Sequence, residues 1–421
     1  MECKNIEIKK GMSLHTIETS KFKTNLLAIM ITTELTKENA TKNALISLIL
    51  RRGTANIPTQ DEISKKLENM YGANFDCGID KIGDNQIIKF YLESLSDEYL
   101  PEKDSNLKES IRMLLDIVCN PITEENKFKT EYFDAEKEKL KQIIEAKKDN
   151  KGMYAFNRCI EEMYKNKPYA TYKFGELEEL EKITNEELYK YYKELIQECK
   201  FDIYISGEKI EEIKTEIENN ENIAKLKPRD AKYITNSLEE PTEIKEKTVQ
   251  ESADITQGKL VIGMNIEQKM ENSKNIALIY NAILGGTATS KLFQNVREKA
   301  SLAYTAGSNY VRQKGNVFIR CGIEIENYEK ALEIIKKQIE DMKQGNFTEE
   351  ELENTKQYII STIQEIKDEQ DTQIAYYFSH ELAKTDSSIE KYINDVRKVT
   401  KEQIIEIAKT VKINTIYFLK N

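Results

Sequence analysis

The chain has 421 residues, of which 39% are hydrophobic and 32% are charged, and its formal net charge is −10. This length predicts two domains, and the composition is that of a folded protein and not of a disordered one. The acidic balance argues against nucleic acid as the main ligand, because phosphate binding needs grouped lysines and arginines.

The N-terminal segment Met1–Lys10 is charged and lacks the apolar stretch of a signal peptide. No apolar run in the chain approaches the roughly 20 residues needed to span a bilayer. We therefore expect a cytoplasmic protein with no membrane segment.

Two copies of one pattern appear in the sequence. Leu27–Thr54 and Leu260–Thr287 align without a gap, and ten of their 28 positions are identical. Each copy predicts a short apolar strand, a polar turn and an apolar helix that ends at Gly-Thr. A glycine just past a helix is a common signal for its C-terminus.

The same order of elements follows both copies. Phe75–Glu93 and Ala306–Glu324 each predict two strands around a turn, which is centred on Gly83 and Gly315 respectively. Each half then closes with a predicted strand; these are Phe201–Gly207 and Thr415–Lys420.

Helix starts also recur in matching order. Thr123 and Thr348, each followed by two glutamates, predict the first pair of helix starts. Capping boxes are predicted for the second pair, formed by Thr184 with Glu187 and by Thr400 with Gln403.

Five matching blocks in one order indicate a tandem duplication. Strands mixed with long helices favour an α+β fold, with two homologous domains that each have a mainly antiparallel sheet and helices on one face. The polar stretch Ala224–Lys247, with Pro228 and Pro241, predicts a linker. We expect an N-terminal domain at 1–223, a linker at 224–247 and a C-terminal domain at 248–421.

The second copy continues into a stretch that combines glycines with an arginine and a tyrosine. Gly285 and Gly286 permit a tight loop that a peptide could approach closely, although they also fit an ordinary helix C-terminus. Arg297 and Tyr304 would share one face of a continuous helix. Arginine offers a fork of donors, and tyrosine offers a hydroxyl to an oxyanion. The alternative is a solvated arginine and a half-buried tyrosine.

The string L-G-G-x-x-x-S-x-L-F-Q-x-x-R-E-K-x-x-L-A-Y, which ends at Tyr304, resembles the C-terminal domain of the pitrilysin-type (insulinase-type) zinc peptidases. That family includes the mitochondrial processing peptidase. The resemblance covers essentially the whole chain, because members consist of two homologous domains of this size in a clam-shell. It implies that Arg297 and Tyr304 contact a substrate peptide and that Tyr304 helps to stabilise the tetrahedral intermediate.

Catalytic members of the family carry the inverted zinc motif His-x-x-Glu-His on the helix before the first Gly-Thr. The two histidines bind zinc and the glutamate is the general base. The resemblance places Ala44, Ser47 and Leu48 at those positions, and the downstream ligand position falls near Gln142. Glu138 or Glu145 could be shifted into that position, but a lone carboxylate cannot hold zinc.

The absence of the motif does not depend on the alignment. His15 and His380 are the only histidines in the chain, so His-x-x-Glu-His cannot occur anywhere. We expect both to be structural or surface residues. The cysteines form no C-x-x-C pair and predict single thiols; they are Cys3, Cys77, Cys119, Cys159, Cys199 and Cys321.

This combination favours a non-catalytic, substrate-binding subunit of a heterodimeric zinc metallopeptidase. The chain itself would hold no metal, and a catalytic homologue with His-x-x-Glu-His would supply zinc and base to cleave unfolded peptides. Arg297 would hold the peptide main chain and Tyr304 would face the oxyanion. The alternative is a stand-alone peptide-binding or assembly protein, as in the respiratory-complex core subunits of the family. No Ser/His/Asp or Cys/His set indicates a peptidase of another kind.

Overall fold

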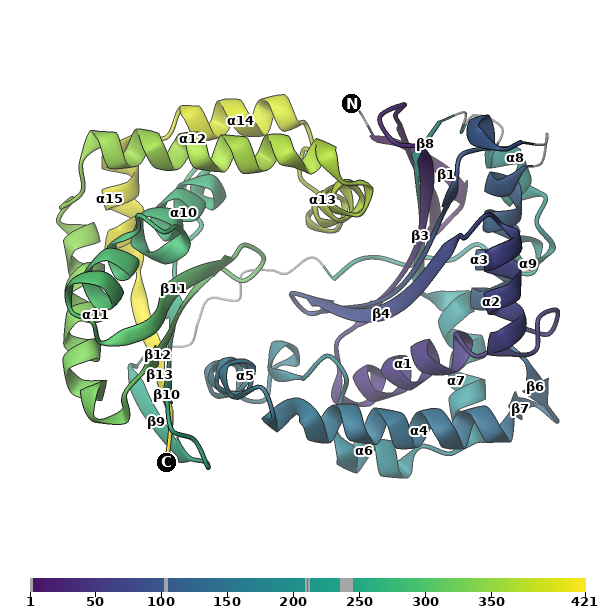
Figure 1. Ribbon diagram of the computed structural model, residues 1–421, viewed down its shortest axis with the longest axis horizontal. Helices are drawn as coiled ribbons and strands as arrows, with labels where there is room; N and C mark the ends of the chain where they lie inside the picture. The colour runs from purple at the N-terminus through teal and green to yellow at the C-terminus, as the bar shows by residue number, and fades with distance from the viewer. Residues whose placement is uncertain (1–2, 102–104, 209, 211–212, 235–244) are drawn as a thin grey trace. The chain divides into compact units, whose positions relative to one another are not determined.

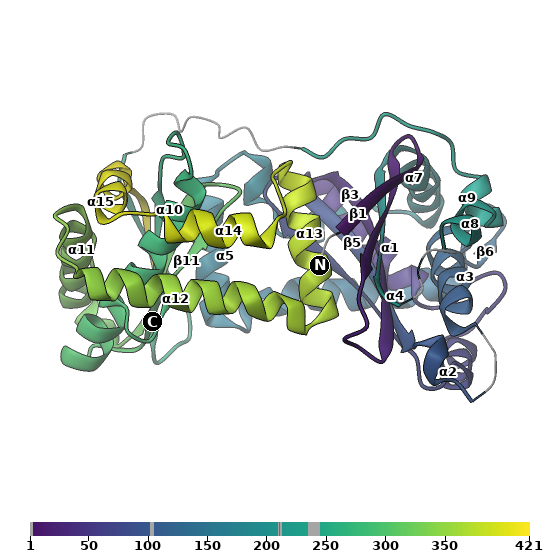
Figure 2. The same ribbon diagram turned by 90° about the horizontal axis from the view of Figure 1, so that it is seen from above.

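The computed structural model describes residues 3–101, 105–208, 210, 213–234 and 245–421. It divides into two compact units, each an antiparallel-rich sheet covered by helices (Figures 1 and 2). Unit 1 comprises Met1–Ala146, Thr171–Thr235 and Glu369–Thr385. Unit 2 comprises Lys147–Ala170, Asn236–Asp368 and Asp386–Asn421. Each unit therefore combines segments from both halves of the sequence.

The sheet of unit 1 has six strands in the order β1-β2-β8-β3-β5-β4. All neighbours are antiparallel except β2 and β8, which run parallel. Gly83 forms the turn between β4 and β5 at a φ of 58°, as predicted. The strands are β1 (Cys3–Lys9), β2 (Met12–Glu18), β3 (Thr24–Glu34), β4 (Asn74–Ile82), β5 (Asn85–Leu95) and β8 (Lys200–Gly207).

Most helices of unit 1 cover one face of this sheet, where alternate strand residues such as Ile29, Phe90 and Ile203 form the core. These helices are α1 (Lys37–Leu50), α2 (Gln60–Asn69), α3 (Asn106–Cys119), α4 (Thr130–Glu145), α6 (Leu177–Lys182), α7 (Asn185–Glu198), α8 (Ile213–Glu218) and α9 (Glu221–Ala224). The opposite face carries α13 (Gln370–Ala383), whose Phe378 ring lies 6.1 Å from the Tyr204 ring of β8.

The sheet of unit 2 has five strands in the order β11-β12-β10-β13-β9. Only β9 and β13 pair in parallel. Gly315 forms the turn between β11 and β12 at a φ of 59°. The strands are β9 (Lys247–Ser252), β10 (Gly258–Asn265), β11 (Ala303–Val311), β12 (Asn316–Ile323) and β13 (Lys412–Lys420).

The helices of unit 2 also lie mostly on one face of their sheet (Figure 1). They are α10 (Ser273–Asn281), the π-helices η5 (Ala282–Gly286) and η6 (Phe293–Lys299), α11 (Tyr328–Lys343), α12 (Glu349–Glu365), α14 (Ile389–Arg397) and α15 (Lys401–Thr410). The other face carries α5 (Lys151–Met163), whose Phe156 ring lies 5.0 Å from the Phe318 ring of β12.

Helices α5 and α13 therefore occupy equivalent places in the two units, and each comes from the other half of the sequence. The predicted α+β class, with two mainly antiparallel modules, is confirmed. The single helix on the second face of each sheet is an addition to that prediction.

The helix start predicted at Thr123 is wrong. Thr123–Glu124 (β6) and Lys127–Phe128 (β7) form a short hairpin, and α4 begins at Thr130. Glu125 and Asn126 form the turn with φ values of 48° and 65°. Asparagine tolerates this left-handed region, so turn formation outcompetes the N-cap pattern.

The other predicted helix starts are confirmed. Thr348 and Thr400 each form a complete capping box with the residue three positions on. Thr184 caps α7 by accepting a hydrogen bond from the Glu187 amide, but the Glu187 carboxylate accepts one from the Thr184 hydroxyl and not from the Thr184 amide, so the capping box predicted there is incomplete.

The first part of the predicted linker packs on unit 1, whereas residues 235–244 lie outside the described residues. Arg229 Nε donates to the Cys199 carbonyl at 2.8 Å. Tyr233 Oη donates to Asp202 Oδ2 at 2.7 Å. These contacts tie the segment to strand β8 and to Cys199, which immediately precedes it.

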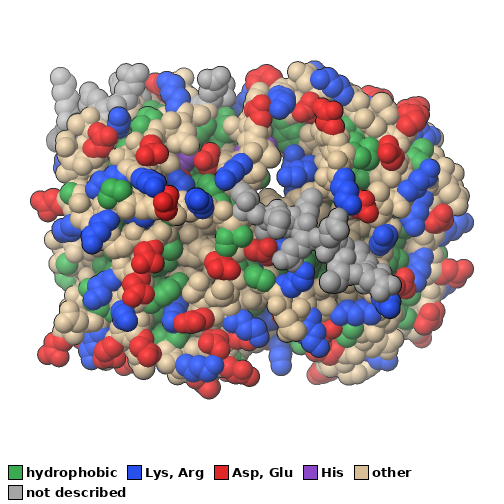
Figure 3. Space-filling model, turned by 180° about the vertical axis from the view of Figure 1, so that it is seen from behind, with side chains coloured by type: hydrophobic (Ala, Val, Ile, Leu, Met, Phe, Trp, Pro, Cys, Tyr) green, Lys and Arg blue, Asp and Glu red, His purple; other side chains and the backbone are tan. Residues whose placement is uncertain are grey.

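Charged side chains of both signs are interspersed over the face that Figure 3 shows, and no broad basic area occupies it. In the part of the chain that the structure describes, no helix combines the length and apolar character needed to cross a membrane.

Candidate functional site

The glycine pair lies in η5, which continues α10 toward the edge strand β11. Neither Gly285 nor Gly286 has a positive φ, so the pair does not form a left-handed helix cap. A Cβ atom on Gly285 would lie 2.6 Å from Ser308 Oγ and 2.7 Å from Ser308 N. Gly285 therefore permits the close packing of η5 against β11, and the close approach is made within this chain.

Arg297 projects from η6, the second of two π-helices that flank a short loop. Such helices are rare and occur frequently at functional sites. The Arg297 guanidinium lies 4.5 Å from the Phe293 ring centroid, and Arg297 Nε lies 3.6 Å from Glu298 Oε1. The side chain is 43% exposed, so part of the guanidinium is available to a ligand.

The expectation of one continuous helix from Arg297 to Tyr304 is wrong. Helix η6 ends at Lys299, and Ser301 turns the chain at a φ of 52°. The amide of Leu302 then donates to the Val296 carbonyl at 3.1 Å, and β11 begins at Ala303. Burial of Leu302 and Ala303 drives this turn, so Tyr304 projects from a strand and not from a helix.

Tyr304 is 62% exposed, the largest exposure of any bulky apolar or aromatic side chain in the described part of the chain. Its hydroxyl donates to Glu324 Oε1 at 2.8 Å. This hydrogen bond and the charge of Glu324 raise the pKa of Tyr304 above its usual value of 10. The phenol is therefore protonated at neutral pH and can act as a hydrogen-bond donor.

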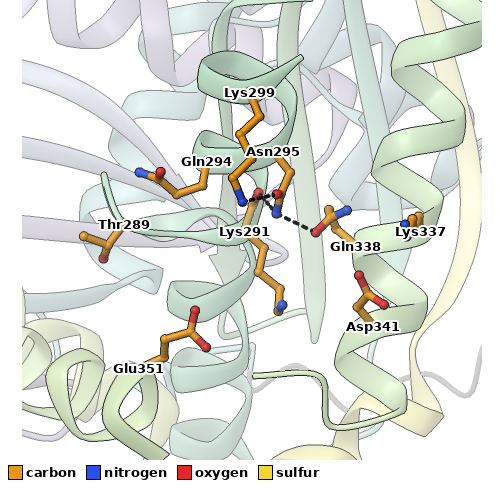
Figure 4. A pocket seen from close by; sticks show the side chains of 9 residues that line it. All are labelled: Thr289, Lys291, Gln294, Asn295, Lys299, Lys337, Gln338, Asp341 and Glu351. Carbon is orange, nitrogen blue, oxygen red and sulfur yellow. Dashed lines mark hydrogen bonds between the residues drawn. The ribbon is translucent and has the colours of Figure 1, made fainter. Parts of the chain in front are cut away.

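A polar pocket of about 350 Å³ separates η6 from α11 (Figure 4). Asn295 Nδ2 donates to Gln338 Oε1 of α11 at 2.8 Å, and Lys299 Nζ donates to Asn295 Oδ1 at 3.2 Å. Arg297 lies two residues from both Asn295 and Lys299, so it projects from a different side of the helix. The pocket contacts thus anchor η6 and leave Arg297 free of them. The lining residues are Thr289, Lys291, Gln294, Asn295, Lys299, Lys337, Gln338, Asp341 and Glu351.

The residues that the sequence comparison predicts at the zinc-motif positions lie in unit 1, and the three on α1 pack in its core or against it. Ala44 and Ser47 are buried in α1, and Leu48 packs against the same core. Ser47 Oγ donates to the Ala44 carbonyl at 2.8 Å, so the hydroxyl is satisfied by its own helix. Gln142 is exposed on α4. These four residues do not fit a metal ion, because they offer neither imidazole nor carboxylate.

Both histidines have partners within the fold. His15 Nε2 lies 3.0 Å from Asp202 Oδ1, and His380 Nδ1 lies 2.8 Å from Thr385 Oγ1. Throughout the described ranges, no group of three or more His, Cys, Asp or Glu residues could hold a metal ion. Burial raises the pKa of the Cys119 and Cys321 thiols to about 12, which makes them poor nucleophiles and poor ligands.

We expect the purified chain to contain no stoichiometric zinc and to melt at the same temperature with and without a chelator. The reason is that the positions at Ala44, Ser47 and Leu48 lack metal-binding atoms, so no bound ion stabilises unit 1. Elemental analysis and calorimetry in EDTA test this. One zinc per chain, or a clear fall in melting temperature on chelation, would contradict it.

Comparison with known proteins agrees with this geometry. A family model described as "Peptidase M16 inactive domain" matches residues 182–359. The chain is 34% identical to a probable inactive metalloprotease, YmfF, of Bacillus subtilis (strain 168), over 97% of this chain and 96% of that protein.

Two solved structures share the whole fold. A conserved protein from Enterococcus faecalis V583 superposes with a TM-score of 0.89 and 28% identity, and the match covers 100% of this chain and 99% of that one. The peptidase M16 inactive domain from Pseudomonas fluorescens has a TM-score of 0.80 and 18% identity, with 100% and 98% covered. At that identity the second likeness concerns the fold alone.

Two peptidase-type modules in a chain that contains no His-x-x-Glu-His define a metallopeptidase-like protein without the zinc motif. The chain belongs to the peptidase M16 family, the pitrilysin/insulinase-type peptidases that the Leu284–Tyr304 string predicted.

Proposed function

We propose that the chain is the non-catalytic, substrate-binding subunit of a heterodimeric zinc metallopeptidase that acts on unfolded peptides. One observation carries this proposal. Arg297 and Tyr304 are both exposed and contribute little to the core, whereas Ala44 and Ser47, at two of the predicted metal positions, are buried. Exposed polar groups that the fold does not need are available to a ligand.

Each exposed group has a chemically suitable role. The guanidinium of Arg297 offers several N–H donors to main-chain carbonyls of an extended peptide. The protonated hydroxyl of Tyr304 exchanges its Glu324 partner for the oxyanion that forms at the scissile carbonyl. A homologous partner with His-x-x-Glu-His supplies the zinc and the general base that Ala44, Ser47 and Leu48 do not provide.

An assembly protein without proteolytic activity is the competing function. Such a protein needs a peptide-binding surface but has no use for a hydroxyl aimed at an oxyanion. The exposure of Tyr304 therefore favours the subunit role.

Affinity purification of the chain from its native cells tests the partner directly. We expect to recover a homologue of similar size that contains His-x-x-Glu-His, in a one-to-one complex by analytical ultracentrifugation. Recovery of the chain alone, or only with proteins that lack this motif, would refute the subunit role and favour the assembly protein.

A further inference from the structure

The face of the unit 2 sheet that carries α5 is only partly covered. Helix α5 packs over β10 and β13, where Gly263 leaves room for Met163 and Cys159. At the β11 and β12 end, beyond the N-terminus of α5, a group of residues is left partly open. We call Lys259, Thr305, Gly307 and Arg320 the open corner, and Gly322, which lies between them on β12, is buried. Strand register joins them, because Gly307 pairs with Arg320, and both Thr305 and Lys259 pair with Gly322.

Arg320 is a half-buried cation in this corner without a carboxylate partner in the described part of the chain. Its guanidinium lies 5.1 Å from the Phe156 ring, and Nη2 donates to Met153 Sδ at 3.5 Å. Thioether sulfur is a weak acceptor. By contrast, Arg158 on the same face pairs with Glu161 at 2.6 Å and with Glu251 at 3.1 Å.

Burial lowers the pKa of Arg320 from its usual value, which reports a desolvation cost that no protein carboxylate offsets. The aromatic ring of Phe156 and the sulfur of Met153 also fix the side chain in place. A guanidinium that is held in position and partly stripped of water is prepared to bind an anion.

Lys259 adds a second cation to the open corner. Its ammonium hydrogen-bonds to the neutral side chain of Gln257, and burial lowers its pKa. It lies diagonally across the strand pair from Arg320, a separation of roughly 7–8 Å between neighbouring strands. Glu251 lies in register with Lys259, because both residues pair with Leu419 of β13. The Glu251 carboxylate already has other partners, which are Tyr154, Arg158 and Tyr417.

The open corner begins next to the proposed peptide site. A register shift between Ala303 and Thr305 leaves both Tyr304 and Thr305 exposed at the sheet edge. From Thr305 to Lys259 is two strand spacings, roughly 10 Å. An extended peptide covers that distance in about three residues.

We propose that Arg320, assisted by Lys259, binds a carboxylate of the peptide that Arg297 and Tyr304 engage, so that the chain selects peptides with an acidic group about three residues from the Tyr304 contact. This inference rests on the proposed function. The carboxylate is either an acidic side chain or the C-terminus of the peptide, since both offer two oxygens to a guanidinium fork.

The test uses the full chain and fluorescein-labelled, unstructured peptides of identical length. One pair differs by Glu in place of Gln, and a second pair by a free or an amidated C-terminus. Fluorescence anisotropy is expected to show about tenfold tighter binding of the peptide that carries the recognised carboxylate. The pair that shows the difference identifies the source of the carboxylate.

Arg320→Met keeps an apolar stem against Phe156 and removes the charge. We expect it to abolish the tenfold difference while the affinity for neutral peptides and the melting temperature stay unchanged. Arg312→Met is the matched control, because Arg312 stacks on Tyr392 at 5.2 Å and lies outside the open corner. It should keep the difference.

Three outcomes are decisive. Equal binding of acidic and neutral peptides by the natural chain, or unchanged discrimination in Arg320→Met, overturns the Arg320 inference and leaves the proposed function intact. Peptide binding that is insensitive to Arg297→Met refutes the proposed site instead. If none of the peptides binds the full chain, both proposals fail.

Discussion

Replacing Asp202 by alanine is expected to lower the free energy of unfolding of unit 1 by about 3–5 kcal/mol. Asp202 is fully buried on β8. Its carboxylate lies 3.0 Å from His15 Nε2 and 2.9 Å from Lys200 Nζ, and it accepts a hydrogen bond from Tyr233 at 2.7 Å. Without the carboxylate, these three polar groups lose their common partner. Leaving buried polar groups without a partner costs more stability than replacing the whole network by apolar groups.

Denaturant unfolding measured by circular dichroism checks the Asp202 prediction. Asp230→Ala is the control. Asp230 forms an ion pair with Lys10 at 2.9 Å, but the Lys10 and Asp230 side chains are 60% and 74% exposed. Exposed ion pairs of this kind add little stability. Trypsin gives a local readout, since loss of the Tyr233 anchor should speed cleavage after the exposed Lys232. An Asp202→Ala protein as stable as the natural chain would contradict the prediction.

The natural chain and Asp202→Ala should also differ in how their stability changes in acid. Burial opposes ionisation of Asp202, but the His15 hydrogen bond and the charge of Lys200 outweigh it, so the pKa of the carboxyl lies below its usual value of 3.8. A carboxyl whose pKa is lower in the folded protein than in the unfolded protein stabilises the fold at pH values above its unfolded-state pKa. This stabilisation is lost as the pH falls toward the folded-state pKa. The difference in the free energy of unfolding between the natural chain and Asp202→Ala should therefore become smaller below about pH 4. A difference that widens in acid would contradict this assignment.

Tyr304→Phe should reduce turnover of the complex with the catalytic partner by about 10²–10³-fold, which is the usual effect of removing one oxyanion donor. The substitution deletes a hydroxyl from a side chain that is 62% exposed, so the fold and the complex should be unaffected. Because the change removes a contact made in the transition state, we expect kcat to fall with little change in KM.

Tyr358→Phe is the matched control for the Tyr304 prediction. Tyr358 is 54% exposed on α12 and is outside the predicted site. Steady-state kinetics with one quenched fluorescent peptide compares the two variants at equal zinc content. Turnover by Tyr304→Phe that equals that of Tyr358→Phe would exclude Tyr304 as the oxyanion donor.

Local patterns predicted the duplicated framework well. Gly83 and Gly315 form turns between strands at the expected positions, and Thr348 and Thr400 cap helices as expected. These features depend on a few neighbouring residues, whose turn and capping preferences agree with the fold. Thr123 is the exception, because turn formation at Glu125 and Asn126 prevails over the N-cap pattern.

Long-range packing could not be predicted in the same way. Helices α5 and α13 look like ordinary amphipathic segments, and nothing in their spacing indicates that each packs on a sheet built from the other half of the sequence. The departure of Tyr304 from the helix of Arg297 depends on the burial of Leu302 and Ala303, which is a tertiary effect. The sequence held one weak indication that Arg320 has a specific role, because arginine is scarce in this lysine-rich chain.

The candidate site shows the same limit of prediction from the sequence. Ala44, Ser47 and Leu48 were predicted as the zinc-motif positions by counting along one helix, and the structure shows that they pack in the core or against it. Gly285 was predicted either to permit a loop that a peptide could approach or to end a helix, and its close neighbour is Ser308 of β11. Sequence spacing supplied the candidate residues and could not reveal which neighbours they have.

The most direct test of the central claim is peptide cleavage by the chain reconstituted with a homologue that carries His-x-x-Glu-His. We predict zinc-dependent turnover by the pair that exceeds the turnover of either chain alone, with all of the zinc bound to the partner. A homologue that cleaves the same peptides equally fast without this chain would contradict the claim.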